Sequence, residues 1–374
     1  MPPPKPVLIC ALSGRALAQA ARAAGFAPIV LDAFGDLDTR DAAERWLRVP
    51  VDRRWIFRRR PLLAAAARLA PAPIPLIWGS GFERATALLA ELAAGRPIWG
   101  NLPAEVRAVK DPFAFAAALR RLGIAHPEIR DHAPKDPDGW LCKRAGGAGG
   151  GHVRPAGPRP PRGRGWYWQR RARGRPVSAL LLGSRVVAFS EQWATPRAGQ
   201  RFRFAGAVAP ANLTPVARDR LGNAATSLAI HFELKGLGSV DALVAGDSVT
   251  VLEANPRPGA ALDAYRGSLD FDLLRAHVDA CRGLAVPAPS ACTGAAGSLI
   301  VYAPYALEIP MRFAWPNWTA DRSPEGTRIE AGGPICTVLA KADDSKSARA
   351  LLLTRERAMQ ESLIPAAGGR SRAG

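Results

Sequence analysis

Residues 240–259 read VDALVAGDSVTVLEANPRPG, and this stretch decides the fold. Two apolar runs flank the turn Gly246-Asp247-Ser248, a pattern that predicts a β-hairpin. If the loop is these three residues, Ala245 pairs with Val249 and the register places Asp241 opposite Glu253. Asn255, two residues after Glu253, then lies on the same face of the hairpin, so three oxygen-bearing side chains converge.

Two carboxylates directly opposite each other repel by about 0.2–1 kcal/mol unless a cation lies between them. An amide oxygen beside them completes the set of hard ligands that Mg²⁺ prefers. We therefore predict a metal site at Asp241, Glu253 and Asn255. A loop of two or four residues would instead put the two carboxylates on different faces, and the alternative interpretation is a solvated polar strand end.

A lysine followed by a glycine-rich segment precedes the hairpin in the sequence. Lys143 is followed by Gly146-Gly147-Ala148-Gly149-Gly150-Gly151. Glycines let consecutive backbone N–H groups converge on phosphate oxygens, and a nearby ammonium neutralises the added charge. Because the lysine comes before the glycines and no Ser or Thr follows it, the segment is not a P-loop. A flexible linker has the same composition, and that alternative stays open.

The first hundred residues alternate between strand and helix patterns. A short apolar run at 6–12, a helical pattern to residue 24 and a second apolar run at 27–31 form a β-α-β opening. Further apolar runs at 74–78 and 97–100 predict an open parallel sheet. The turn after the first run carries only Gly14, so the glycine pattern of NAD-binding domains is absent.

The pattern changes after the helix expected at 104–122. Strands are predicted at 139–143, 166–169, 177–182, 186–192 and as a pair at 239–255, with a helix at 215–231, so the middle of the chain reads as an antiparallel sheet with helices on one side. Short strands at 296–302 and 335–340, a helix from 347 to about 361 and a disordered tail at 365–374 complete the chain. The expected domains are 1–100, 101–285 and 286–364, the last small and β-rich.

The composition fits a globular protein with reduced cysteines. The chain has 374 residues and a formal net charge of +19, yet arginine supplies most of that charge, which indicates solvated surface cations rather than a nucleic-acid site. No run approaches the ~20 apolar residues that cross a bilayer, and five dispersed cysteines suggest neither disulfides nor a zinc site, so we expect a cytoplasmic protein without a membrane partner.

Taken in order, these features resemble the ATP-grasp superfamily of carboxylate–amine ligases and carboxylases, with distant similarity to biotin carboxylase. The resemblance implies an α/β and α+β chain: a Rossmann-like N-terminal domain, an ATP-grasp domain and a small C-terminal β-rich extension. Its most specific element is the acidic hairpin that ends in Glu253-x-Asn255-Pro256-Arg257. It implies ATP as a bound nucleotide with Mg²⁺, or Mn²⁺ in its place.

The resemblance also implies residue roles. Lys110 and Lys143 would contact the phosphates of ATP, the glycines Gly146, Gly147, Gly149, Gly150 and Gly151 would form a mobile flap, and Gln169, Arg170, Arg171 and Ala172 would form the adenine hinge. Asp241, Glu253 and Asn255 would hold the metal, and Arg257, with Lys143, would serve catalysis. Hinges of the family tend to read Gln-Glu, and Arg170 here leaves the contact to the ribose unassigned.

The resulting expectation is a ligase that activates a small carboxylate as an acyl phosphate and couples it to an amine. Similarity to predicted carboligases, some encoded beside one-carbon cofactor genes, implies a role in making methanopterin- or methylofuran-type cofactors, and a homo-oligomer is compatible with this. Two alternatives stay open: a carboxylase or phosphoryl-transfer enzyme of the same fold, and a non-catalytic nucleotide- or RNA-binding protein. The acceptor is expected near Ser13, Gly14 and Arg257, with Arg197, Arg201 and Arg203 as candidate anion contacts.

Overall fold

A parallel sheet opens the chain, as the sequence predicts. The structure, a computed structural model, describes residues 3–157, 159, 161–197, 200–286 and 294–363. The strands of the first sheet follow the order β3-β2-β1-β4, and their bounds are Lys5–Cys10 (β1), Phe26–Asp32 (β2), Arg45–Arg48 (β3) and Leu76–Trp78 (β4). Residues 97–100, which we predicted as a strand, form only a bridge between Ile98 and Leu76 of β4. The strand β3 lies at the opposite edge of the sheet, beside β2.

Helices cover both faces of this sheet because its inner strands, β1 and β2, are largely apolar on both sides. Val7 and Ile9 face α1 (Arg15–Ala23), whereas Leu8 and Cys10 face the side of α3 (Arg59–Leu69) and α4 (Thr86–Leu92). The short α2 (Leu37–Ala42) follows β2, and Asp36 caps it by accepting a hydrogen bond from the backbone N–H of Thr39. The carboxyl ends of β1, β2 and β4 therefore present their loops to one edge of the domain.

The single helix predicted at 104–122 is two helices, α5 (Pro103–Lys110) and α6 (Pro112–Arg121). Pro112 has no N–H to continue α5, and the Asp111 side chain accepts hydrogen bonds from Phe113 and Ala114 to cap α6. The break places Lys110 in the last turn of α5, where its side chain turns toward the acidic hairpin.

The middle of the chain forms two sheets rather than one. The smaller has the order β5-β8-β6-β7, with strands Ile129–Arg130 (β5), Trp140–Arg144 (β6), Arg154–Pro155 (β7) and Trp166–Arg170 (β8). The larger has the order β13-β12-β9-β10-β11-β14-β18-β16. Five of its strands come from the middle of the chain, and they are Arg175–Leu182 (β9), Arg185–Ala194 (β10), Phe204–Ala209 (β11), Leu237–Ala245 (β12) and Ser248–Asn255 (β13). The other three come from the C-terminal part, and they are Ala295–Tyr302 (β14), Thr319–Ala320 (β16) and Pro334–Ala342 (β18). A polar turn at residues 171–174 carries the chain from one sheet to the other.

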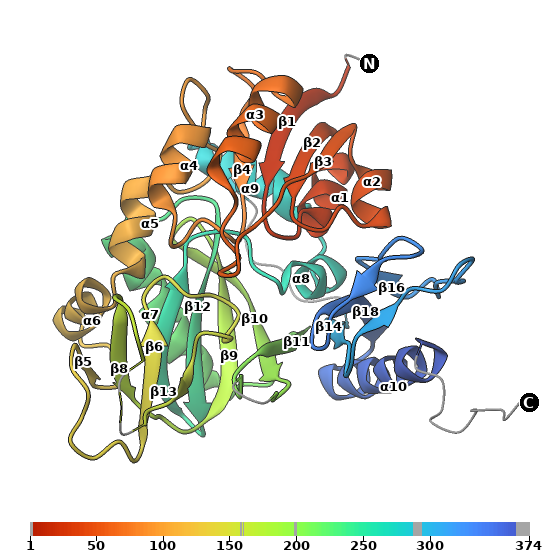
Figure 1. Cartoon of the computed structure of the whole chain (residues 1–374). Coiled ribbons are helices and arrows are strands. Elements are labelled where there is room, and N and C mark those ends of the chain that lie inside the picture. Colours follow the sequence, from red (N-terminus) through yellow and green to blue (C-terminus); the bar gives the residue numbers. More distant parts are fainter. Residues whose placement is uncertain (1–2, 158, 160, 198–199, 287–293, 364–374) are drawn as a thin grey trace, which may run out of the picture.

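Both faces of the larger sheet are covered, which corrects the prediction of helices on one side. Val177, Ala179 and Leu181 of β9 pack against α7 (Pro215–His231), whereas Leu180 and Leu182 pack with α8 (Leu262–Ser268) and α9 (Leu273–Cys281). Both faces of β9 are apolar, and a strand with that pattern requires a partner layer on each side. Figure 1 shows the larger sheet at the centre, with the N-terminal domain above it.

The C-terminal strands continue the larger sheet. β14 (Ala295–Tyr302) pairs with β11 and with β18 (Pro334–Ala342), which pairs in turn with β16 (Thr319–Ala320). β15 (Leu307–Glu308) and β17 (Arg328–Ile329) form a separate ladder, and α10 (Ser345–Leu363) packs on β14 and β18 (Figure 1). The tail predicted at 365–374 lies outside the described residues.

No helix in the described part of the chain is long and apolar enough to cross a membrane. The four cysteines at described positions, Cys10, Cys142, Cys281 and Cys336, are not paired in disulfides.

Candidate active site

The acidic hairpin brings Asp241 opposite Glu253, as predicted, but by another route. Its turn has two residues, Gly246 and Asp247, so Ala245 pairs with Ser248 and not with Val249. This register alone would place Asp241 opposite Leu252, on the wrong face. A β-bulge between Asp241 and Ala242 restores the pair with Glu253.

The two-residue turn is favoured because Gly246, with a φ of 58°, adopts the left-handed conformation that matches the twist of the flanking strands. Val249 and Val251 pack with α7 in the core on the face opposite to Asp241. The bulge therefore separates the apolar half of the hairpin from its polar end.

A continuous chain of contacts joins the predicted metal ligands to Lys110. The two carboxylate oxygens of Asp241 accept hydrogen bonds from Ser178 Oγ at 2.6 Å and Asn255 Nδ2 at 2.9 Å. Asn255 Oδ1 accepts a hydrogen bond of 2.7 Å from Lys110 Nζ, which also lies 3.8 Å from Glu253 Oε2. Ser178, which the sequence did not single out, reaches Asp241 because β9 and β12 pair in that register.

The two facing carboxyl groups differ in their pKa. Burial, with the charge of Glu253 adding to it, raises the pKa of Asp241 to about 6. Burial also acts to raise the pKa of Glu253, but the ammonium groups of Lys110 and Lys143 outweigh it and hold that pKa below its usual value. The two lysine ammonium groups thus compensate the negative charge of the facing carboxylates, a role that a bound divalent cation would otherwise have.

The donor set fits a hard divalent cation, since it offers two carboxylates and one amide oxygen. No cluster of three or more His, Cys, Asp or Glu side chains suited to a metal occurs among the described residues. The three side chains therefore leave coordination positions of a cation unfilled, and a bound nucleotide would have to supply the further oxygen ligands.

Lys143 projects from β6 toward the same cluster. Its buried Nζ donates a hydrogen bond of 2.8 Å to Gln169 Oε1 on the neighbouring β8. Burial lowers the pKa of Lys143, and Lys110 adds to this, while Glu253 and Asp241 oppose it. The structure therefore brings both predicted lysines to the acidic pair.

The glycine-rich segment joins β6 to β7 and lies against two other parts of the chain. Gly149 accepts a hydrogen bond of 3.0 Å from the backbone N–H of Phe204. Gly150 has a φ of +72°, and a Cβ there would lie 1.8 Å from the carbonyl oxygen of Phe202. At Gly146 a Cβ would meet Arg84 and the carbonyl of Glu83. A side chain at Gly146 or Gly150 would thus prevent the loop from reaching this position.

Two backbone N–H groups of the predicted hinge already have hydrogen-bond partners within the chain. The N–H of Arg170 donates to the carbonyl of Glu128, and the N–H of Arg171 donates to the carbonyl of Gly139. The Arg170 guanidinium donates to the carbonyl of Asp138 at 3.3 Å and lies over the ring of Trp140. Because the Arg170 side chain points toward Asp138 and Trp140, the contact to the ribose stays unassigned.

Arg257 has a partner that sequence reasoning missed. Its Nε donates a hydrogen bond of 2.6 Å to Oε1 of Glu83, in the turn after β4, and both side chains are buried. Although burial acts to raise the pKa of Glu83, Arg257 and Lys110 hold it below its usual value. An acid beside the glycines of residues 79–81 was the available signal, but nothing in the sequence links positions 174 residues apart.

One pocket opens beside this cluster and encloses about 510 Å³, including its mouth. Its wall combines apolar groups of α6 and β13 with Lys110, Glu253, Gln169, the start of the glycine loop and His152. Lys143, Asp241, Asn255 and Arg257 lie outside that wall, so the pocket and the polar cluster overlap without coinciding.

Contacts within the chain fill the region near Ser13, where the sequence analysis places the acceptor substrate. Ser13 Oγ and the guanidinium of Arg15 both donate to Asp321, and Arg15 also pairs with Asp263 at 2.7 Å. This buried group ties the N-terminal domain to α8 and to the turn after β16. Asp32 accepts a hydrogen bond from the backbone of Gly14, and burial raises its pKa to about 6.

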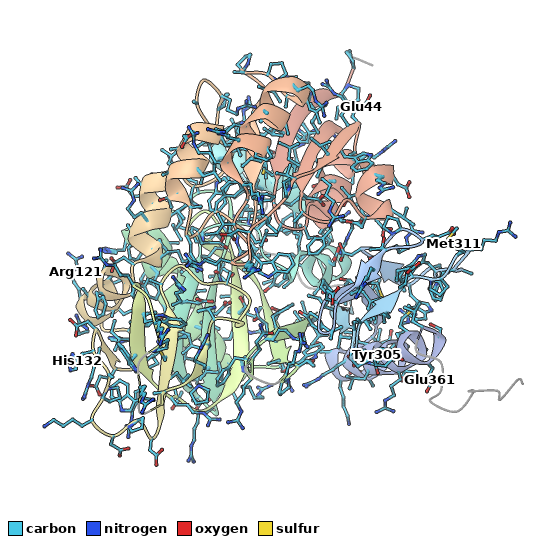
Figure 2. All side chains as sticks on the ribbon, viewed as in Figure 1. Glu44, Arg121, His132, Tyr305, Met311 and Glu361 are labelled. Carbon is cyan, nitrogen blue, oxygen red and sulfur yellow. The ribbon has the colours of Figure 1, made fainter. Side chains whose placement is uncertain are left out.

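The arginines of the loop after β10 do not gather on one ligand site. Arg203 stacks on Tyr302 and donates to the carbonyl of Gly332 at 3.0 Å, and Arg197 lies against Gly332 as well. Arg201 is exposed. Figure 2 shows His132 at the outer surface, and its side chain is 74% exposed.

Comparison with known families identifies the fold. The family model of the ATP-grasp domain matches residues 109–261, the segment that contains Lys110, Lys143, Asp241, Glu253 and Arg257. Residues 109–261 therefore form an ATP-grasp domain. The match begins one residue before Lys110 and ends just beyond the acidic hairpin, so this ATP-grasp domain contains every predicted ligand of nucleotide and metal.

Solved structures extend the likeness to the whole chain. The ADP complex of N5-carboxyaminoimidazole ribonucleotide synthetase superposes with a TM-score of 0.68 at 15% identity and covers 96% of this chain and 99% of its own. The biotin carboxylase domain of Hydrogenobacter thermophilus 2-oxoglutarate carboxylase, bound to MgADP, ADP and bicarbonate, gives 0.69 at 14% identity, covering 94% and 88%.

A single-chain, multi-domain long-chain acyl-CoA carboxylase gives a TM-score of 0.71 at 16% identity and covers 94% of this chain. The chain described here spans only 39% of the length of that carboxylase. At these identities the likeness shows a shared fold. No curated protein matches the sequence significantly.

Proposed function

We propose that this protein is an ATP- and Mg²⁺-dependent ligase that activates a small carboxylate as an acyl phosphate and couples it to an amine. One observation carries the proposal: contacts join Lys110, Asp241, Glu253 and Asn255 in one cluster, and the ammonium of Lys143 lies close enough to lower the pKa of Glu253. Facing carboxylates balanced by two ammonium groups suit a triphosphate with its cation better than an uncharged ligand.

Each group has a distinct part in this reaction. The carboxylate oxygen of the substrate attacks the γ-phosphorus and ADP leaves, after which the amine nitrogen attacks the acyl carbon, phosphate leaves and the amine loses a proton. Lys110 and Lys143 neutralise phosphate charge, and Arg257, oriented by Glu83, stabilises the acyl phosphate or the transferring phosphoryl group. Asp241, Glu253 and Asn255 would hold Mg²⁺, which supplies charge neutralisation at the phosphates.

The glycine loop would exclude water from the activated carboxylate. Its backbone packs against Phe202 and Glu83, and its first glycines line the pocket together with Lys110. A closed loop matters for this chemistry because an acyl phosphate hydrolyses when water reaches it.

A second candidate is an ATP-dependent carboxylase, in which bicarbonate is the carboxylate. The similar structures favour it, since one holds bicarbonate with MgADP and another is an acyl-CoA carboxylase. A finer role, the ligation of a small acid and amine in methanopterin- or methylofuran-type cofactor synthesis, belongs to the first candidate and would place the enzyme in the cytoplasm.

The deciding experiment is a screen for ADP release from ATP and Mg²⁺ in bicarbonate-free buffer. Pools of small carboxylates and amines are added together and separately, and each active pool is then repeated with bicarbonate. A ligase releases ADP only when an acid and an amine are both present, whereas a carboxylase requires bicarbonate. Absence of nucleotide binding or ADP release under all conditions would refute both candidates.

A further inference from the structure

The segment from residue 139 to residue 190 contains no Asp or Glu, although the whole chain has 32 of them. The same segment holds one lysine and ten arginines. Composition alone indicated solvated surface cations, but an even spread of charge would place several acids among so many residues. The cations of this segment are instead gathered without compensating carboxylates, so they repel one another unless an anion binds.

Strand alternation in the smaller sheet separates many of these cations from the candidate active site. Lys143 of β6 and Gln169 of β8 point toward that site, where their side chains bond each other. Neighbouring residues of a strand point to opposite faces, so Arg144 and its pairing partner Trp166 lie on the other, outer face. Arg154 of β7 lies on this outer face as well, by its pairing with β6. Figure 1 shows β5, β6 and β8 at the lower left edge of the molecule, away from α10.

Trp166 orders two arginines on the outer face. The guanidinium carbons of Arg154 and Arg144 lie 4.9 Å and 5.4 Å from the centre of its ring. Its Nε1 donates a hydrogen bond of 3.2 Å to the carbonyl oxygen of Arg162, which fixes the ring. Neither guanidinium forms an ion pair with an acid among the described residues. An arginine held over an aromatic ring keeps its N–H groups available to bind phosphate.

The loop after β3 presents a second tryptophan beside an arginine. Trp55 is 49% exposed, and its φ of 60° is rare for so large a side chain. Asp52 holds the loop in this shape, because its Oδ1 accepts hydrogen bonds from the backbone N–H groups of Arg54 and Ile56 at 2.8 and 3.0 Å. Backbone strain of this kind persists only where the surrounding structure imposes it, and it is concentrated at functional sites. The loop therefore holds an indole ring at the surface with Arg54 next to it.

Arg84, in the turn after β4, joins these two places. A Cβ at Gly146 would lie 2.6 Å from Cγ of Arg84, so this side chain packs against the start of the glycine loop. Burial lowers the pKa of Arg84, and the charges of Arg144 and Arg54 lower it further, against the opposing effect of Asp52. The three guanidinium groups are thus close enough to repel one another. An anion bound along this line would remove that repulsion.

The exposed groups of this surface indicate the class of partner. Protein interfaces have an apolar core with few charges, whereas interfaces with nucleic acid are polar and strongly positive. Trp140 and Trp168, the large apolar side chains of the outer face, are 5% and 6% exposed and cannot supply an apolar core. Phosphates bind guanidinium groups, and an unpaired base can stack on the exposed ring of Trp55. A duplex would leave Trp55 without a base to stack on, so a single strand fits this surface best.

We propose that the chain has a docking surface for single-stranded nucleic acid, which we term the cationic surface. Its residues are Arg54, Trp55, Arg84, Arg144, Arg154 and Trp166. The guanidinium groups bind phosphates, Trp55 stacks with a base, and Trp166 keeps its two arginines in place. Because Arg144 also lines the pocket, a bound strand would pass close to the pocket mouth. The inference does not rest on the proposed ligation, since none of these residues belongs to the cluster of metal and phosphate groups.

The test measures the fluorescence anisotropy of a labelled oligouridylate. With about 20 nucleotides and salt between about 50 and 200 mM, we expect a slope of about −3 in log K against log salt, since each phosphate contact of a single strand contributes about −0.7. The triple variant Arg54→Gln, Arg84→Gln, Arg154→Gln should weaken binding at least about 10-fold and reduce the slope by about 2. Trp55→Gly, which suits the positive φ, should weaken binding about 5-fold or more without changing the slope, and Trp55→Tyr should retain most of the affinity.

A matched control removes the same charge from other parts of the molecule. Arg218, Arg282 and Arg357 are exposed and lie on α7, at the end of α9 and on α10. Each triple variant lowers the formal net charge from +19 to +16. Replacing these three control arginines by Gln should change the dissociation constant by less than about threefold, because the charges lie away from the cationic surface. Melting temperatures show whether each variant remains folded.

Three results would overturn the inference. The first is equal weakening by the two triple variants, which would show that only net charge matters. The second is a different partner, recognised by tighter binding of a duplex or by polyglutamate that displaces the probe as well as unlabelled oligouridylate does. The third is absence of binding to the unaltered protein at about 50 mM salt. None of these results depends on ADP release, so the proposed ligase activity is judged separately.

Discussion

Glu83→Gln tests whether the buried pair of Glu83 and Arg257 holds the N-terminal domain against the ATP-grasp domain. The substitution keeps the shape of the side chain and removes its charge. Glu83 Oε1 accepts from Arg257 Nε at 2.6 Å, and Oε2 accepts from the backbone N–H of Gly81 at 2.9 Å. The amide of glutamine can satisfy only one of these two donors, because its nitrogen is itself a donor.

The structure sets the size of the expected loss. The two side chains are only 9% and 3% exposed, so water cannot replace the lost charge around Arg257. Breaking one side of a buried ion pair costs about 3–5 kcal/mol, and the acceptor that glutamine retains places this variant near the lower end. We therefore expect Glu83→Gln to lower the free energy of unfolding by about 3 kcal/mol.

The assay is equilibrium urea unfolding of the unaltered protein, Glu83→Gln, Arg257→Gln and the double variant. The double variant should lose at least about 2 kcal/mol less than the sum of the single losses, because each single change leaves the other partner buried and unpaired. Additive losses, or a loss below about 1 kcal/mol for Glu83→Gln, would show that the pair does not stabilise the domain contact.

Four further outcomes are expected. Glu253→Gln should reduce ATP turnover by roughly 10²–10³-fold with an unchanged circular dichroism spectrum, and near-normal turnover would contradict the metal assignment. Lys143→Ala should abolish the rise in melting temperature that Mg²⁺ and ATP give the unaltered protein, and a retained rise would remove Lys143 from the phosphate site. Gly150→Ala should raise KM for ATP with little change in stability, since a Cβ would meet the carbonyl of Phe202, and an unchanged KM would show that the loop need not close there. Burial raises the pKa of Asp32 to about 6, so between about pH 4 and 6 the folded state holds a proton that the unfolded state releases. Stability relative to Asp32→Asn should therefore fall by about 3 kcal/mol as pH rises through that window, as followed by urea unfolding, and a pH-independent difference would be inconsistent with this pKa.

The acidic hairpin shows how far pattern reasoning reached. Alternation of apolar and polar residues identified both strands, and the pair of Asp241 with Glu253 is confirmed. The predicted loop of three residues was wrong, because Ala245 pairs with Ser248. A bulge is set by packing on both faces of the sheet, and no local signal at Ala242 announces it.

The helix before the glycine loop shows a different limit. The apolar spacing of residues 104–122 continues through Pro112, so the period alone predicted one helix. The rule that proline cannot continue a helix was available in the sequence and would have placed Lys110 at a helix end. Its contact with Asn255, in contrast, joins positions 145 residues apart and could come only from the folded chain.

The parallel opening sheet, α7, the acidic hairpin and the residue types of the candidate nucleotide site could be predicted from the sequence alone. Each depends on short-range periodicity or on the chemistry of neighbouring residues. Tertiary structure alone decided that Glu83 meets Arg257, that Ser178 bonds Asp241, and that β14 and β18 extend the larger sheet. It also decided that His152 Nδ1 is buried without a partner. These contacts depend on which distant segments pack together and exclude water from one another. The local pattern of residues along the sequence does not specify that packing.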